Sequence, residues 1–292
     1  MRCLALLALL VPAPALAHAR ESHGGWTLDP WVTGPLLLTA LLYATGFARL
    51  WRRSDQGRPS LRRGAALFTG GWATLAGAIV SPLHAAGEAS FTFHMAEHEL
   101  IMLPAALLLV VSRPGAAMLW GLPAAMRGGL GGIARRGKGL WRFVTDPVVA
   151  TALQLAAMWA WHAPGPFDRA LDSQSWHIAQ HISFLVAALL FWWAMMHGRG
   201  GRYRWGTSAF CLFVTSLAGG ALGALMALSR SPWYAGYAAM GMTPSGLTPA
   251  EDQQLAGLLM WIPGGAFHGA AALVFLWKWL NASEVGHALA AE

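Results

Sequence analysis

Long apolar blocks alternate with short polar stretches along this chain of 292 residues, and the length of the blocks indicates the fold class. Each block lies near the roughly 20 residues that an α-helix needs to cross a bilayer. The approximate limits of the blocks are 31–50, 65–83, 94–112, 147–163, 176–196, 207–228 and 255–279. The pattern predicts an all-α integral membrane protein whose transmembrane domain, residues 31–280, is a bundle of about seven transmembrane helices.

The beginning of the chain differs from these blocks because its apolar core is short. Arg2 precedes a run of leucine and alanine, and the stretch ends with Ala15-Leu16-Ala17. This arrangement predicts a secretory signal peptide over residues 1–17, with an uncleaved membrane anchor as the alternative. Under either interpretation residues 18–30 form a periplasmic segment, so the N-terminus lies outside.

The basic residues between the blocks predict the orientation of the bundle. An outside N-terminus makes 51–64, 113–146 and 197–206 cytoplasmic connections and residues 281–292 a cytoplasmic C-terminal tail. The cytoplasmic connections hold Arg52, Arg53, Arg58, Arg62, Arg63, Arg113, Arg127, Arg135, Arg136, Lys138, Arg142, Arg199, Arg202 and Arg204. The outer side of the mature chain keeps only Arg20, Arg169 and Arg230. This division obeys the positive-inside rule.

Composition narrows the class of protein further. The chain is 56% hydrophobic and 11% charged, whereas soluble domains carry about 25% charged residues. A net charge of +7 could indicate nucleic-acid binding, but the basic residues cluster between apolar blocks, so we expect a membrane and no nucleic acid as partner. A multi-pass protein of the bacterial inner membrane is predicted. Cys3 and Cys211 offer no Cys-x-x-Cys site, so any metal would be held by His, Met or carboxylate.

Two pairs of histidines open two of the apolar blocks. His94 and His98 begin the third block, and His177 and His181 begin the fifth. Side chains four residues apart share one face of a helix. Ionisable residues in membrane spans are costly, usually face the bundle interior and often mark function. With the predicted orientation, both pairs lie on the outer side, and His162, at the end of the fourth block, lies at the same level.

Five histidines from three helices at one depth predict a metal or haem site. His84, His268, Met102 and Met260 are weaker candidates of a suitable residue type. Imidazole and thioether without thiolate suit copper, especially Cu(I). For any one of these residues the alternative is structural, because a lone membrane histidine can be a hydrogen-bonded interior residue and a methionine can simply pack.

Zinc and haem are the alternatives to copper. The stretch His94-Met95-Ala96-Glu97-His98 fits H-x-x-E-H, in which two histidines bind zinc and the glutamate activates water for hydrolysis. However, the second pair has Gln180 at the matching place, and no carboxylate elsewhere is an evident third ligand. Paired histidines on adjacent helices could also be axial ligands of haem in an electron-transfer protein.

The start of the last block carries a further motif. Thr248 and Glu251 predict a capping box, which leaves Gln253 and Gln254 unexplained. Four motifs in order resemble the multi-span CtaG family of cytochrome c oxidase assembly factors. They are His94-Met95-x-x-His98, Trp161-His162-x-Pro164, Trp176-His177-x-x-Gln180-His181 and Asp252-Gln253-Gln254-x-x-Gly257-x-x-Met260-Trp261.

This resemblance implies a role in assembling a haem–copper oxidase, at the stage of copper delivery, with oxidase subunits as partners. Copper would bind transiently through the two histidine pairs, with His162 as a further candidate, and pass on by ligand exchange. No covalent chemistry is needed, so we do not expect an enzyme. Glu97 departs from the uncharged residue expected in the family, and it keeps the zinc-hydrolase alternative open.

Overall fold

The computed structural model describes residues 25–198 and 204–290, the stretch 283–290 by its backbone alone, so the predicted signal peptide lies outside the described residues. All regular structure within these ranges is helical. The elements up to the second histidine pair are α1 (Pro30–Arg53), α2 (Arg58–Val80), α3 (Pro82–Ala89), α4 (Phe91–Leu100), η2 (Ile101–Ala105), α5 (Ala106–Ser112), α6 (Gly115–Gly121), α7 (Ala124–Arg136), α8 (Lys138–Val144), α9 (Pro147–His162) and α10 (Pro164–Asp172). The remaining elements are α11 (Gln174–His197), α12 (Arg204–Leu228), α13 (Ala235–Met240), α14 (Pro249–Leu259), η4 (Met260–Gly264) and α15 (Gly265–Ala290).

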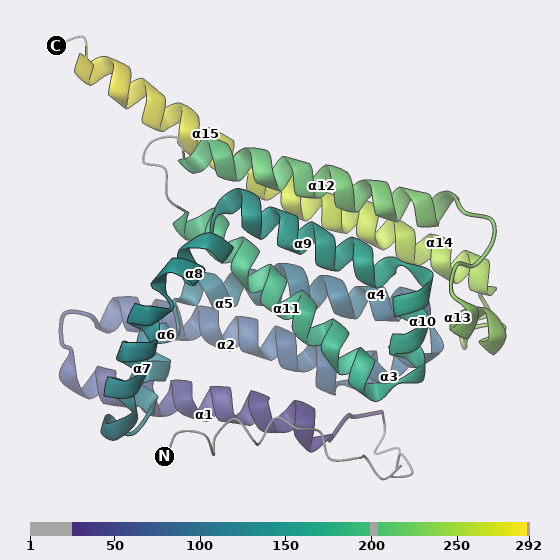
Figure 1. Ribbon diagram of the computed structural model, residues 1–292, viewed down its shortest axis with the longest axis horizontal. Coiled ribbons are helices and arrows are strands. Elements are labelled where there is room, and N and C mark those ends of the chain that lie inside the picture. The colour runs from purple at the N-terminus through teal and green to yellow at the C-terminus, as the bar shows by residue number, and fades with distance from the viewer. Residues whose placement is uncertain (1–24, 199–203, 291–292) are drawn as a thin grey trace.

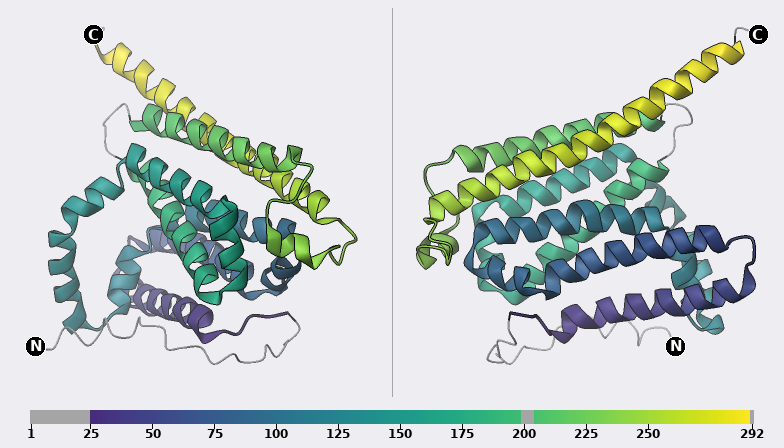
Figure 2. Two further views of the ribbon diagram at one scale, coloured as in Figure 1. Left: turned by 45° about the vertical axis from the view of Figure 1, so that its right-hand side comes forward. Right: turned by 180° about the vertical axis from the view of Figure 1, so that it is seen from behind.

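The long helices lie side by side in a bundle, and short helices cover its two ends (Figures 1 and 2). At one end α3, α10 and α13 close the bundle, and we call this the histidine end. At the other end α6, α7 and α8 lie beside the connection between α1 and α2, and we call this the basic end. The basic end carries the Gly- and Arg-rich stretch 113–146, which forms helices α6 to α8.

The number of membrane spans depends on two bent helix pairs. Five helices of the described chain are long and apolar enough to cross a membrane, and seven spans result if each bent pair counts as one. The pairs are α2 with α3, bent by 43°, and α8 with α9, bent by 67°. Proline opens the second helix of each pair because its missing N–H is tolerated only in the first turn. The chain is therefore a multi-pass membrane protein.

Two of the spans are interrupted by π-helical segments. The segment η2 separates α4 from α5 around Pro104, and η4 separates α14 from α15 around Pro263. Proline cannot donate a backbone hydrogen bond inside a helix, so the regular ladder breaks there. Side chains satisfy nearby carbonyl groups: Nε1 of Trp192 donates to the Met102 carbonyl at 2.9 Å. Breaks of this type are frequent at functional sites.

The N-terminus of α14 fixes the N-terminus of α4. The predicted capping box of Thr248 and Glu251 is confirmed at the start of α14. The neighbouring Asp252 instead caps α4, because its carboxylate accepts from Ser90 Oγ at 2.8 Å and from the Phe91 N–H at 2.6 Å. A carboxylate at a helix N-terminus satisfies unpaired donors and interacts favourably with the helix dipole. The helix carrying His94 and His98 is thus held in register with α14.

Gln253 and Gln254, which the capping box leaves unexplained, form hydrogen bonds to the loop between α12 and α13. Oε1 of Gln253 accepts from the Trp233 N–H at 2.6 Å, and its Nε2 donates to the Ser231 carbonyl at 3.2 Å. Gln254 donates to the Ser229 carbonyl at 2.9 Å. These polar groups therefore satisfy backbone groups of the loop between α12 and α13.

Candidate metal centre

Three elements bring histidines to the same end of the bundle. His84 lies on α3, His94 and His98 lie in the first turns of α4, and His177 and His181 lie in the first turns of α11. The chain bends by 43° between α2 and α3, and α3 packs against α4, so His84 reaches the two pairs from a third helix. We call these five residues the outer histidine cluster.

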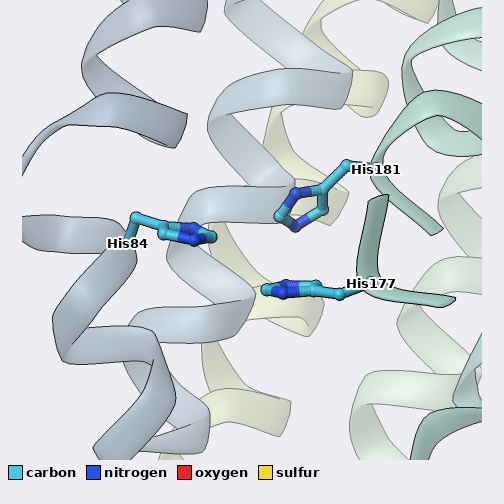
Figure 3. Close-up of side chains that lie close together, drawn as sticks. All are labelled: His84, His177 and His181. Carbon is cyan, nitrogen blue, oxygen red and sulfur yellow. The ribbon is translucent and has the colours of Figure 1, made fainter. Parts of the chain in front are cut away.

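The tightest part of the cluster is formed by His84, His177 and His181. One ring nitrogen of each lies within 4.8 Å of those of the other two. Figure 3 shows the three rings converging from α3 and α11. The rings of His84 and His177 are nearly parallel, with centroids 5.3 Å apart, and those of His177 and His181 are 4.4 Å apart. Three imidazole nitrogens this close are a typical protein contribution to a metal site with an open position.

The first histidine pair lies directly against the second. The ring centroids of His94 and His177 are 5.5 Å apart, and those of His98 and His181 are 5.1 Å apart. Within the first pair the centroids are 4.3 Å apart. The two pairs thus lie at one depth, as predicted, and the structure brings them face to face.

A buried carboxylate orients the cluster. Glu97 is fully buried, and its Oε1 lies 2.9 Å from Nδ1 of His84 and 3.7 Å from Nε2 of His181. An ionised carboxylate only accepts hydrogen bonds, and opposite an ionised Glu97 Nδ1 of His84 carries the proton and Nε2 keeps its lone pair. Histidines that bind metals commonly donate their second nitrogen to a carboxylate in this way. Glu97 can therefore position a metal ligand without abstracting a proton from any substrate.

Burial of His98 adds a second indication of a ligand. His98 is 3% exposed, and neither of its ring nitrogens has a hydrogen-bond partner among the described residues. A buried polar atom without a partner costs roughly 1–3 kcal/mol. A bound cation offsets that cost, so the environment of His98 favours a metal.

The other candidates do not join the cluster. His162, at the end of α9, has Nε2 3.3 Å from Sδ of Met95, and its ring contacts are with Phe167 and Phe184. His268 on α15 stacks on Trp192 with centroids 5.9 Å apart. Met102, Met260, His162 and His268 all border a separate cavity, which we call the inner cavity. His98 belongs to the outer histidine cluster and also borders the inner cavity.

Sequence reasoning underweighted two residues and missed a third. His84 was a weaker candidate, yet it forms part of the tightest group. Glu97 was a departure from a family pattern, and its contact with His84 gives it a structural partner. Met95 was not a candidate, although its place between His94 and His98 put it beside the motif. The turn signal Ser81-Pro82 was the available sign that His84 folds back.

Comparison with known proteins gives a family and two relatives. The profile of the family described as "Cytochrome c oxidase caa3 assembly factor (Caa3_CtaG)" matches residues 41–282. Over 176 residues, or 59% of this chain, the sequence is 30% identical to "Uncharacterized protein Mb0105" of Mycobacterium bovis and to "Uncharacterized protein MT0111" of Mycobacterium tuberculosis. The matched region spans 26% of each relative, about a quarter of its length. No solved structure matches the chain. The family match extends from α1 into α15 and includes both histidine pairs, so this chain belongs to the family of cytochrome c oxidase caa3 assembly factors.

Proposed function

We propose that this protein assists the assembly of a haem–copper cytochrome c oxidase by binding copper at the outer histidine cluster and passing it to an oxidase subunit. The observation that carries the proposal is the convergence of three nitrogens from His84, His177 and His181 within 4.8 Å. Family membership supports a cytochrome c oxidase as the protein that receives the metal, and the histidine cluster supports copper as the metal that is passed on.

The donor set favours copper over other metals. Imidazole suits copper and zinc, whereas the thioethers of the neighbouring inner cavity suit Cu(I) and are not among the usual zinc ligands. The five imidazoles of the cluster exceed the two to four ligands of a single Cu(I) ion. Spare ligands of one chemical type allow the ion to exchange partners stepwise, as transfer to an acceptor requires.

The proposed place of action is the outer face of a bacterial inner membrane. In a seven-span topology with the N-terminus outside and the C-terminus cytoplasmic, the histidine end faces the periplasm. The distribution of charge supports this orientation, because α7 and α8 at the basic end carry Arg127, Arg135, Arg136, Lys138 and Arg142. The cluster is then accessible to oxidase domains on the periplasmic side.

The proposal is tested in a host strain that lacks the chromosomal copy of the gene. We expect wild-type protein to restore cytochrome c oxidase activity under limiting copper, and His84/His177/His181→Ala to leave most of that activity unrestored. Added copper should partly rescue the variant. The control is His197→Ala at the basic end, where Nε2 of His197 accepts from Arg113. Full restoration by the triple variant at normal membrane abundance and limiting copper would contradict the proposal.

A further inference from the structure

The inner cavity has an unusual lining for the interior of a membrane bundle. Its volume is about 30 Å³, and a water molecule needs about 10–15 Å³, so it can hold one ion or two to three waters. Four thioethers line it, those of Met95, Met102, Met158 and Met260. The cavity is too small for an organic substrate, and its sulfur atoms suit a soft ion.

His162 faces one of these sulfur atoms with a lone pair. Nδ1 of His162 lies 2.6 Å from the Met158 carbonyl, which only accepts, so Nδ1 carries the proton. Nε2 then keeps its lone pair and lies 3.3 Å from Sδ of Met95, which is also an electron-pair donor. Two lone pairs facing each other in a buried site are unfavourable unless a cation lies between them. Zinc bonds of about 2.0 Å to histidine nitrogen and 2.3 Å to thiolate sulfur set the scale of such contacts, and one ion at these distances reaches both atoms.

His268, which also lines the cavity, makes the same kind of backbone hydrogen bond. Nδ1 of His268 donates to the Gly264 carbonyl at 3.0 Å, and its Nε2 has no hydrogen-bond partner among the described residues. In both histidines, a proton donated to the carbonyl four residues earlier leaves Nε2 as the ligand atom. This backbone hydrogen bond is the usual support of a metal-binding imidazole.

The two π-helical segments independently point to the same cavity. Met102 comes from η2 and Met260 from η4, so both interrupted spans contribute a thioether to one space. The buried carboxyl group of Glu99 lies there too, with one oxygen unpartnered among the described residues. A Cβ on Gly264 would lie 2.8 Å from that oxygen, so the carboxyl group packs closely against the glycine. A buried carboxyl group either stays protonated or needs a cation to compensate its charge.

We propose that the inner cavity is a second copper site, in which Nε2 of His162 and Sδ of Met95 hold one Cu(I) ion. The outer histidine cluster exchanges this ion with the cavity through His98, which contacts His94 and His181 on one side and borders the cavity on the other. This inference rests on the proposed function, because it takes copper as the cargo. The ion changes ligands and keeps its oxidation state, so the exchange needs no electron donor or acceptor.

The outer histidine cluster and the inner cavity then differ in the metal ions that they bind. An all-imidazole cluster suits zinc as well as copper, whereas a mixed imidazole–thioether cavity favours Cu(I), because thioether is not a usual zinc ligand. Passage through the inner cavity thus selects Cu(I) from the metals that reach the cluster.

The test uses the purified protein in detergent, loaded with Cu(I) under a reductant, with bound copper counted and its ligands identified by X-ray absorption. We expect two copper ions per chain and a copper–sulfur shell. In Met95→Leu/Met260→Leu the count should fall from two to one, and the sulfur shell should disappear. The matched control is Met240→Leu/Met242→Leu, because these methionines are 55% and 67% exposed outside the cavity, and it should behave as wild type.

A second variant separates the loss of a ligand from a disturbance of packing. His162→Gln keeps a polar side chain and all four thioethers, and it should also abolish the sulfur shell while the helical circular dichroism stays unchanged. A sulfur shell that survives in both variants overturns the inner site. One copper ion per wild-type chain with nitrogen ligands alone also overturns it and leaves the proposed function intact. The triple variant His84/His177/His181→Ala gives the converse case. If it binds one sulfur-bound copper ion and oxidase assembly is normal, the proposed function is overturned and the inner site is left intact.

Discussion

Oε1 of Glu97 lies 2.9 Å from Nδ1 of His84, and this contact joins α3 to the helix that carries the first histidine pair. The relationship decides between two roles of Glu97. An orienting acceptor needs only an oxygen at this place, whereas the general base of a zinc hydrolase needs a carboxylate.

Glu97→Gln keeps an oxygen that accepts from His84, and Glu97→Ala removes it. We therefore expect the glutamine variant to retain most oxidase assembly and copper affinity. The alanine variant should lose roughly 10–100-fold in copper affinity, as is usual when the carboxylate behind a metal-binding histidine is removed. Copper competition titrations on both purified variants measure the difference. Abolition of function in the glutamine variant, at normal abundance, would favour hydrolysis.

Asp252 should matter for the stability of α4 rather than for metal chemistry. In Asp252→Ala, the buried Ser90 hydroxyl and the Phe91 N–H lose their acceptor. Losing a helix cap typically costs about 0.5–2 kcal/mol, so we expect a lower melting temperature in detergent and a weaker hold on copper. Glu251→Ala, at an exposed position in the capping box of α14, is the control and should change the melting temperature less. Equal effects of the two substitutions would show that Asp252 has no special role in holding α4.

Close packing of α12 against α14 requires glycine at position 257. A Cβ there would lie 2.5 Å from the Gly223 carbonyl oxygen and from the Ala227 nitrogen, both of which are backbone atoms. We expect Gly257→Ala to destabilise the protein by about 1–3 kcal/mol through overpacking. Gly269→Ala is the control, because no atom lies within 4 Å of its added Cβ and alanine favours a helix. Thermal unfolding monitored by circular dichroism should separate the two variants, and equal melting temperatures would refute the close contact.

Reporter fusions test the orientation. A fusion after Arg142 should report the cytoplasm, and fusions after Asp172 and Gly246 should report the periplasm, because the basic end is retained inside. Inversion at any two of these sites would place the outer histidine cluster on the cytoplasmic side and remove it from periplasmic copper delivery.

Local periodicity explains why much of the fold and the common depth of the histidine pairs were predictable. A four-residue spacing fixes a shared helix face, and a block length near 20 residues indicates a span, so the depth of His94, His98, His177 and His181 followed from the sequence. The capping box at Thr248 was equally local.

Contacts between distant elements explain what was not predictable. His84 reaches the cluster because α3 bends back by 43° from α2, an angle that apolar patterning does not determine. His162 shares the predicted depth of the cluster, yet it faces Met95, because rotation of a helix about its own axis depends on packing. The breaks at Pro104 and Pro263 also depend on neighbouring helices that satisfy the backbone.

The shared outer site is tested most directly by counting the copper bound when each histidine pair is removed. The variants are His94/His98→Ala, His177/His181→Ala and the quadruple variant, each in a Met95→Leu/Met260→Leu background so that the inner cavity does not contribute. Groups that act as one unit are not additive, so each double variant should lose most of the remaining copper and the quadruple variant little more. Full copper content in either double variant, with normal folding, would contradict a site shared by α4 and α11.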